Sequence, residues 1–132
     1  MTSRRTIAVP VFVLALLADA ILVLVFVLIG RASHDENPVL GALVTFWPFL
    51  AALAAGWLAC RGWRAPLSIV RTGLPVWAIT VALGMVLRVV ADQGVQLSFV
   101  IVTSIVLAVF LLGWRALAAL VLRLRARRTS RA

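Results

Sequence analysis

Four long apolar runs dominate this sequence, at about residues 7–29, 40–59, 73–90 and 97–114. Each run is close to the length of about 20 residues that an α-helix needs to cross the hydrocarbon core of a bilayer. Hydrophobic residues make up 64% of the 132 residues, which leaves too few polar side chains to cover a water-soluble domain of this size. An α-helix satisfies its backbone hydrogen bonds internally, so each run can enter lipid. The sequence therefore predicts an all-α integral membrane protein, a bundle of four helices.

The segments that join the four runs are short, so consecutive helices are expected to be antiparallel neighbours. No stretch of the chain is left over for a separate water-soluble domain. We expect a cytoplasmic N-terminus, a single transmembrane domain and a basic cytoplasmic tail, at residues 1–6, 7–122 and 123–132.

The basic residues are distributed unevenly along the chain. All 13 are arginines, and 11 of them lie before the first run, between the second and third, or after the fourth. The other side of the predicted membrane has only Arg31 and Arg88, accompanied by Asp35, Glu36 and Asp92. Because cytoplasmic flanks are enriched in Lys and Arg, both termini are predicted to face the cytoplasm. Exclusive use of arginine is typical of a GC-rich bacterial genome. For a helical multi-pass protein with both termini in the cytoplasm, we expect the inner (cytoplasmic) membrane.

A cleaved signal peptide is the alternative interpretation of the first run. Arg4 and Arg5 precede it, and Ala18-Asp19-Ala20 has the small-x-small form of a cleavage site. The apolar run continues unbroken to Ile29, so cleavage would leave a new N-terminus inside an apolar segment. We therefore expect the first run to remain as a membrane span.

Asp19 is the most informative residue because it lies near the middle of the first run. An ionisable group at that depth costs several kcal/mol unless it is paired or hydrated. Counting about 1.5 Å per residue from the cytoplasmic side places Asp19 near Thr103 and Ser104, with Arg88 about one turn further out. We predict an ion pair between Asp19 and Arg88 inside the bundle, with Thr103 or Ser104 as an additional hydrogen-bond partner.

The third run carries a small and polar face. Gly73, Trp77, Thr80, Gly84 and Arg88 follow one another at steps of four, three, four and four, which places them on one side of a helix. This face is suited to packing inward. Together with Asp19, it predicts a polar layer in the outer half of the bundle, formed by Asp19, Thr80, Arg88, Thr103 and Ser104.

The second run has a stripe of small residues, Ala51, Ala55 and Ala59, flanked by Ala52 and Gly56. Small residues four apart let helix backbones approach closely, so this stripe is expected at a helix–helix contact. In the same run, Pro48 lacks an amide hydrogen and therefore frees the carbonyl of Val44.

The segment after the first run contains Arg31, His34, Asp35 and Glu36. Three adjacent side chains do not converge on one metal ion, and the chain has no second histidine, so no metal site is expected. A solvated external turn is the favoured interpretation, and pH sensing by His34 is the alternative.

The tail after the fourth run is basic. Arg123, Arg125, Arg127 and Arg128 are expected to lie along the cytoplasmic headgroups, where each contributes about 1 kcal/mol of attraction to anionic lipid. Membrane topology explains this charge, so nucleic acid is not expected as a partner. The sequence contains no nucleophile elbow, phosphate-binding loop, CxxC pair or HExxH motif, so we expect neither an enzyme nor a cofactor.

A weak internal repeat emerges at an offset of 57 residues. Arg31, Asp35 and Gly56-Trp57 then align without gaps on Arg88, Asp92 and Gly113-Trp114. Two helical hairpins repeated in the same orientation would form a parallel repeat of the kind seen in some transporters. Chance similarity between apolar segments is the alternative.

Several stretches together resemble the bacterial and archaeal membrane family known as domain of unknown function 3054. They are Asp19, Gly30-Arg31 with His34, Pro48-Phe49, Gly73, Trp77 to Val81, Gly84 to Arg88, Phe99 to Val102 and Gly113 to Arg115. The resemblance covers the chain from about residue 10 to residue 117. It implies a small multi-pass membrane protein without an assigned activity, and it makes Asp19, Arg31, His34 and Arg88 the polar members of the family pattern.

Two functions fit these features. The first is a small transport-like protein, homo-oligomeric because four short helices enclose little volume, with the Asp19 and Arg88 pair in the pathway. The second is a non-transporting scaffold or accessory subunit that stabilises a partner membrane complex through its glycine and alanine faces. In that second case the buried ion pair fixes the helix register only.

Overall fold

The computed structural model describes residues 9–31 and 38–131. In these residues the chain is all-helical, which confirms the predicted fold class. The four long helices are α1 (Val11–Arg31), α2 (Pro38–Cys60), α3 (Leu74–Val90) and α4 (Leu97–Ser130). All four are long and apolar enough to cross a bilayer.

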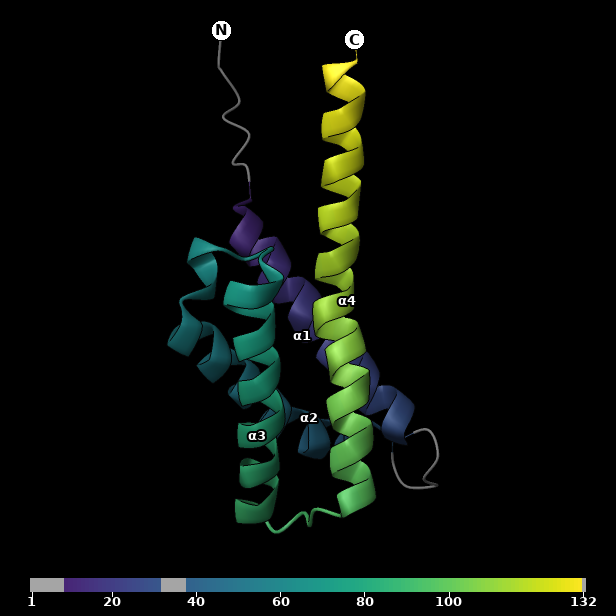
Figure 1. The fold of residues 1–132 in the computed structure, drawn as a ribbon. Helices are drawn as coiled ribbons and strands as arrows, with labels where there is room; N and C mark the ends of the chain where they lie inside the picture. Colours follow the sequence, from purple (N-terminus) through teal and green to yellow (C-terminus); the bar gives the residue numbers. More distant parts are fainter. Residues whose placement is uncertain (1–8, 32–37, 132) are drawn as a thin grey trace, which may run out of the picture.

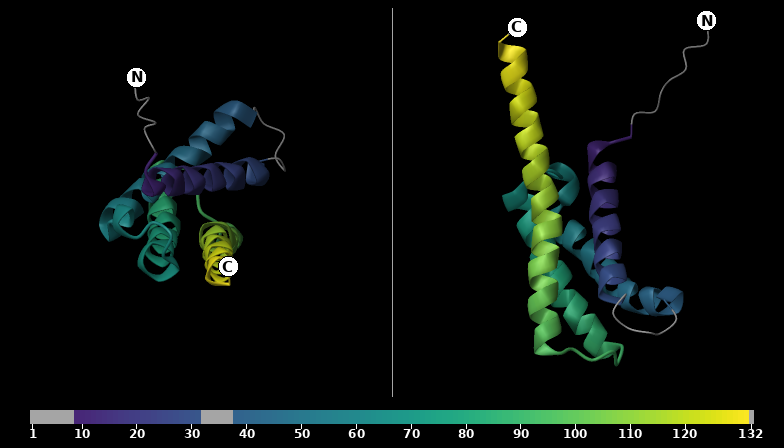
Figure 2. Two further views of the ribbon diagram at one scale, coloured as in Figure 1. Left: turned by 90° about the horizontal axis from the view of Figure 1, so that it is seen from above. Right: turned by 90° about the vertical axis from the view of Figure 1, so that its right-hand side faces the viewer.

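The helices run alternately up and down (Figure 1). The beginning of α1, the link from α2 to α3 and the C-terminal half of α4 lie at one end, which we call the α2–α3 end. The link from α3 to α4 lies at the opposite α3–α4 end. Seen from above, α1 and α2 are inclined steeply to the pair α3 and α4 (Figure 2). That the α2–α3 end faces the cytoplasm stays a prediction from the arginine distribution.

The link between α2 and α3 is itself largely helical. It contains a 3₁₀ turn, η1 (Gly62–Arg64), and a π turn, η2 (Ile69–Gly73), which continues directly into α3. Ser68 Oγ caps η2 by accepting the amide of Arg71 at 3.1 Å. Gly62 is required where η1 begins, because a Cβ there would lie 2.4 Å from the indole of Trp57. The link is therefore packed against the end of the bundle.

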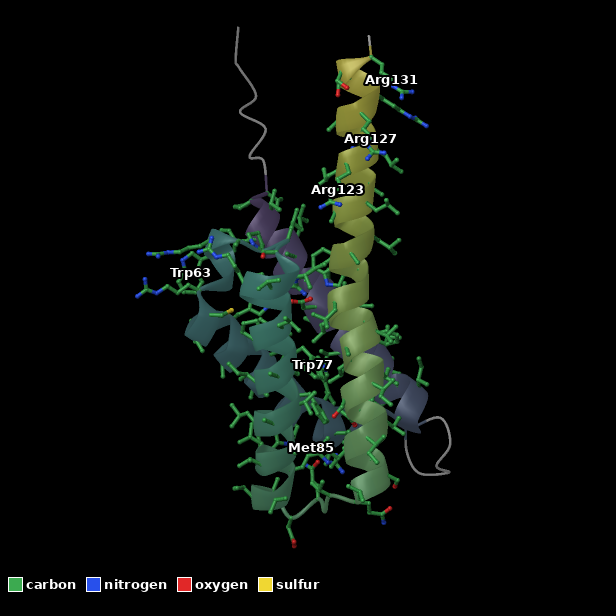
Figure 3. All side chains as sticks on the ribbon, viewed as in Figure 1. Trp63, Trp77, Met85, Arg123, Arg127 and Arg131 are labelled. Carbon is green, nitrogen blue, oxygen red and sulfur yellow. The ribbon has the colours of Figure 1, made fainter. Side chains whose placement is uncertain are left out.

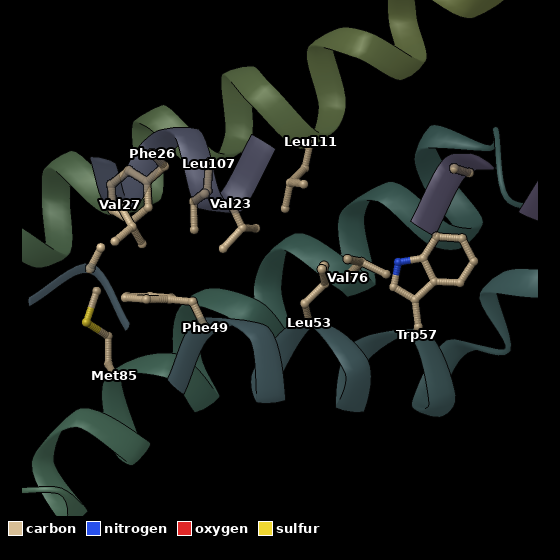
Figure 4. Packing of buried hydrophobic residues seen from close by; sticks show 12 residues of the cluster. Val23, Phe26, Val27, Phe49, Leu53, Trp57, Val76, Met85, Leu107 and Leu111 are labelled. Atoms are coloured by element: carbon tan, nitrogen blue, oxygen red, sulfur yellow. The ribbon is translucent and has the colours of Figure 1, made fainter. Parts of the chain in front are cut away.

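The core follows the helical period in α1 and α4. Every fourth residue of α1 is buried along Ala15, Asp19, Val23 and Val27, and α4 does the same along Thr103, Leu107, Leu111 and Arg115. Phe49 and Leu53 of α2 fill the space between these two faces (Figure 4). Large apolar side chains on the other faces of the helices are exposed, as expected for helices whose solvent is lipid.

α2 packs closely against α3. The small residues at this contact are not those of the predicted stripe Ala51, Ala55 and Ala59. A Cβ on Gly56 would lie 3.2 Å from the Cα of Val76, so only glycine permits this approach without a shift. Ala52 and Gly56 are buried there, whereas Ala51 and Ala59 are exposed on the outer face of α2. Within this chain, Ala51 and Ala59 therefore take no part in the predicted helix–helix contact.

The fourth helix is longer than the apolar run that predicted it. It was expected to end near Trp114 but continues to Ser130, and its 34 residues extend about 51 Å. The predicted basic tail, residues 123–132, is therefore helical as far as Ser130, and it extends past the other helices at the α2–α3 end (Figure 1).

Candidate functional site at the α2–α3 end

The site centres on the carboxylate of Asp19, which is completely buried in α1. Its partner is Arg115 of α4, which is also completely buried. Arg115 donates two parallel hydrogen bonds to the carboxylate. Arg115 Nη2 donates to Asp19 Oδ2 at 2.7 Å, and Nη1 donates to Oδ1 at 2.9 Å. Such bidentate pairs combine full charge compensation with a fixed geometry.

Two indoles complete the coordination of the carboxylate. Trp57 Nε1 of α2 donates to Asp19 Oδ2 at 2.9 Å, and Trp114 Nε1 of α4 donates to Oδ1 at 2.8 Å. Each oxygen therefore accepts two hydrogen bonds, which uses the full capacity of a carboxylate ion. The charge of Asp19 is balanced, and every lone pair has a donor.

Arg115 also reaches beyond Asp19. Its Nε donates to the carbonyl of Pro66 in the α2–α3 link at 3.0 Å, and Nη1 donates to the carbonyl of Leu111 at 2.8 Å. Gly73 lies against it, since a Cβ at that position would be 3.2 Å from Arg115 Cδ. One guanidinium thus joins α1, α4 and the link.

The burial of this pair has an energetic consequence. Taking two ions out of water costs several kcal/mol each, and the cost is offset only when geometry and remaining hydrogen bonds are good. Both conditions hold here, because the two side chains take part in six hydrogen bonds, two with each other, two accepted by Asp19 from indoles and two donated by Arg115 to carbonyls. Removing any one partner would leave a buried charge without its full set of contacts.

The predicted ion pair between Asp19 and Arg88 is wrong in its partner. Gly73, at the start of the third span, lies against Arg115. Arg88 is 15 residues further along the same span, so about 22 Å of helix separates Arg88 from Gly73 and hence from the Asp19–Arg115 pair. Arg88 Nη1 instead donates to Gln93 Oε1 at 3.1 Å. Its guanidinium also lies 4.5 Å from the ring centre of Phe99, a cation–π contact.

The structure also separates the residues of the predicted polar layer. Asp19 lies at the α2–α3 end, whereas Arg88 lies near the α3–α4 end. Ser104 Oγ donates to the carbonyl of Val100 at 2.7 Å. The hydroxyls of Thr80 and Thr103 are buried with no hydrogen-bond partner among the described residues. The predicted hydrogen bonds from Thr103 or Ser104 to Asp19 are therefore wrong.

A second polar cluster closes the α3–α4 end. Gln93 Nε2 donates at 2.9 Å to the carbonyl of Val44, the group that Pro48 was predicted to free. Arg88 Nη2 donates to the carbonyl of Gly94 at 3.3 Å. The turn that carries Gln93 and Gly94 adopts left-handed backbone angles at Asp92 (φ 58°) and Gly94 (φ 72°). The hydrogen bond from Gln93 to Val44 therefore holds the turn between α3 and α4 against the part of α2 that contains Pro48.

The remaining predicted residues divide into two groups. His34 lies outside the described residues, and Arg31 is the last residue of α1. The four arginines predicted to contact lipid headgroups are exposed along the C-terminal part of α4: Arg123, Arg125, Arg127 and Arg128. Among residues 9–31 and 38–131, no three His, Cys, Asp or Glu side chains gather in a way that would hold a metal ion.

Sequence reasoning missed Arg115, Trp57 and Trp114 as site residues. Arg115 follows the fourth apolar run directly and was counted among the cytoplasmic flanking charges. One signal did point to the indoles, because Gly56-Trp57 and Gly113-Trp114 are the paired elements of the internal repeat. A buried acid requires donors, and tryptophan supplies one from an otherwise apolar side chain.

The fold and the site define a multi-pass membrane protein of four helices, closed at one end by a buried and fully hydrogen-bonded ion pair. The chain belongs to the family described as "Protein of unknown function (DUF3054)", whose model matches residues 16–118. The matched range includes Asp19, Trp57, Trp114 and Arg115, and the predicted family is confirmed. Comparison with curated proteins and with solved structures gave no match.

Proposed function

We propose that this protein is a non-transporting membrane scaffold or accessory subunit, which docks a partner membrane protein against the outer face of its bundle. The observation that carries this proposal is the saturated coordination of Asp19. Four donors from α2 and α4 occupy its two oxygens, and neither Asp19 nor Arg115 is exposed. The arrangement is suited to holding helices together rather than to passing an ion along.

A proton relay has two requirements that Asp19 does not meet in this arrangement. An acid in a relay needs a lone pair open to the entering proton and a neighbour that accepts the proton next. Here every lone pair faces a donor, and the donors are an arginine and two indoles, none of which accepts a proton. Transport through Asp19 would require the pair to open.

The interior beyond the ion pair also argues against a pathway through one protomer. Toward the α3–α4 end, the space between the helices is filled by Val23, Val27, Phe49 and Leu107, each at most 1% exposed. Among the described residues, this core has the buried hydroxyls of Thr80 and Thr103 as its polar groups, and two hydroxyls are too few ligands to replace the water around an ion. This packing supports a rigid bundle.

The outer face of α2 is the surface we propose for docking. Ala51 and Ala54 are exposed there, between the exposed side chains of Trp47 and Leu58. Such small side chains let a neighbouring helix approach closely, which strengthens packing between helices in lipid. The outer face of α2, opposite the face that packs on α3, is therefore the surface that we propose for the scaffold's contacts with its partner.

Reconstitution in vesicles tests the absence of transport. We expect proton, sodium, potassium and chloride fluxes of vesicles that contain the protein to equal those of protein-free vesicles. The matched variant is Asp19→Asn, in a preparation shown by circular dichroism to be helical. A flux in the natural protein that disappears in this variant would overturn the proposal and restore the transport-like function.

Photocrosslinking in native membranes tests docking. A photoreactive residue at Ala51 is expected to give a discrete protein adduct, and the same residue at Val86, exposed on α3, is the control. An adduct of twice the mass of the chain would identify the predicted homo-oligomer, and another mass would identify a different partner. Lipid adducts alone at both positions would contradict the docking surface.

A further inference from the structure

We propose that the C-terminal part of α4 stands upright through the headgroup layer and binds anionic phospholipids through a collar of arginines. This inference is independent of the proposed scaffold function. It concerns residues 116–131 at the end of α4, which extend past the other three helices from about Arg123 onward (Figure 3).

The first observation is uncompensated charge. Residues 116–131 contain no acidic side chain and five exposed arginines: Arg123, Arg125, Arg127, Arg128 and Arg131. Of the acidic residues that the structure describes, Asp19 is bound to Arg115 and Asp92 lies at the α3–α4 end. The described residues therefore supply no counter-charge for this segment, which leaves its arginines available to an anionic partner.

The second observation is the arrangement of these arginines around the helix. At about 100° per residue, Arg125 and Arg128 lie about 200° and 140° around the axis from Arg123. Leu120 and Leu124 project between them, and both are exposed. A helix that lies in the plane of the membrane separates its polar and apolar faces, and this one does not. The predicted placement along the headgroups is replaced by an upright one.

The third observation is the depth at which the arginines begin. Arg123 lies eight residues, about 12 Å, beyond the ion-paired Arg115 along α4. Exposed apolar side chains cover α4 over that distance, among them Leu117 and Val121. On the side of α4, the hydrocarbon boundary thus falls just before Arg123. From Arg123 to Arg128 the helix rises about 7.5 Å, which matches the thickness of one headgroup region.

The α2–α3 link carries further basic side chains at the same end, closer to the bundle than Arg123, because Pro66 and Gly73 of the link lie against Arg115. Arg61, Arg64 and Arg71 are exposed on this link. Trp63, which Figure 3 shows at the outer side of the link, is 45% exposed. Tryptophan at this level is typical of the membrane–water interface. A guanidinium group donates two parallel hydrogen bonds to two oxygens of one phosphate. Phospholipids with net negative headgroups are therefore the partner that this chemistry favours.

Accessibility measurements on spin-labelled protein test the upright orientation. Cys60, the single cysteine, is first replaced by serine, and labels are attached at cysteines introduced in place of Leu120, Leu122, Leu124, Ala126 and Thr129. In nanodiscs that contain phosphatidylglycerol, we expect accessibility to a water-soluble relaxing agent to rise steadily along this series. An oscillation with the period of 3.6 residues would show a helix lying on the surface and would overturn the proposal.

Lipid retention tests the partner. Protein purified from mixed phosphatidylglycerol and phosphatidylcholine is expected to retain phosphatidylglycerol preferentially. The preference should fall by about fivefold for each arginine removed in a variant with R123Q, R127Q and R128Q. The matched control with R123K, R127K and R128K keeps the charge and should keep most of the preference. Equal preference in the glutamine variant and the natural protein would overturn the proposal.

Discussion

Trp57 and Trp114 donate their indole N–H groups to different oxygens of the same carboxylate, that of Asp19. The two residues occupy equivalent positions in the 57-residue internal repeat, on α2 and on α4. The position equivalent to Asp19 is Val76, which is fully buried against Gly56. The two hairpins thus contribute one indole donor each to a single acid that only the first hairpin carries, and Arg115 of the second hairpin adds the other two donors. That the two hairpins form a parallel repeat, with chance similarity as the alternative, stays a prediction.

Replacing Asp19 by asparagine should destabilise the bundle strongly. The guanidinium of Arg115 would remain buried without a compensating charge, which typically costs about 3 to 5 kcal/mol. Unfolding of the purified protein by a denaturing detergent, followed by circular dichroism, measures the change in stability. Asp92→Asn is the control, because Asp92 is exposed and its replacement should change stability by less than about 0.5 kcal/mol. Similar stabilities for the two variants would contradict the role of the ion pair.

Removing both charges should cost less than removing one. In a variant with Asp19→Leu and Arg115→Leu, no buried ion is left unpaired, and apolar replacement of buried pairs is often neutral or stabilising. We expect the double variant to be more stable than either single variant in the same unfolding assay. If the two losses simply add, the residues do not act as a pair.

Each indole should contribute separately. Trp57→Phe and Trp114→Phe keep an aromatic ring but remove one hydrogen bond to a charged group, a loss of about 1.5 to 3 kcal/mol. Trp63→Phe is the control, because Trp63 is half-exposed on η1. Unfolding monitored by circular dichroism suits this comparison, since the fluorescence of the protein itself changes with each substitution. If all three variants were equally stable, the indole hydrogen bonds would make no contribution to the stability of the folded protein.

The sequence predicted the four helices well because length and apolar content alone decide whether a segment crosses a membrane. It also predicted that Asp19 must find a cationic partner. It did not identify that partner, because helix rotation and tilt decide which arginine turns inward. Counting residues from a common boundary assumed upright helices, whereas α1 and α2 are inclined to α3 and α4 (Figure 2).

The end of α4 was misplaced for a related reason. Arg115 directly follows an apolar run, so it resembled the arginines that flank membrane spans. Its guanidinium in fact turns inward to Asp19 and Pro66, and α4 continues for 15 more residues. A buried pair cannot be distinguished from an interfacial charge until the facing helix is known.

Packing at Gly84 gives a prediction that concerns the apolar core. A Cβ at this position would lie 2.7 Å from the ring of Phe49, which is itself completely buried. Gly84→Ala should therefore strain the contact between α2 and α3 and cost about 1 to 3 kcal/mol in the unfolding assay. Gly113→Ala is the matched control, because no atom of the described residues, apart from its chain neighbours and the nearby backbone of α4, lies within 4 Å of its Cβ position. Alanine there should be neutral or stabilise α4 by about 1 kcal/mol. Equal effects of the two changes would contradict the close approach.

The contact between Gln93 and Val44 yields the sharpest test of the α3–α4 end. Pro48 leaves the carbonyl of Val44 without its helical donor, and Gln93 Nε2 supplies one at 2.9 Å. Gln93→Ala should therefore cost about 1 kcal/mol, while Gln96→Ala, at an exposed position without a side-chain capping bond, should cost little. In a Pro48→Ala background, the new amide at position 48 can bond to Val44 itself. The loss from Gln93→Ala should then shrink to the part that comes from Arg88, so the two substitutions should not be additive. Additive losses would mean that Gln93 does not compensate for the proline.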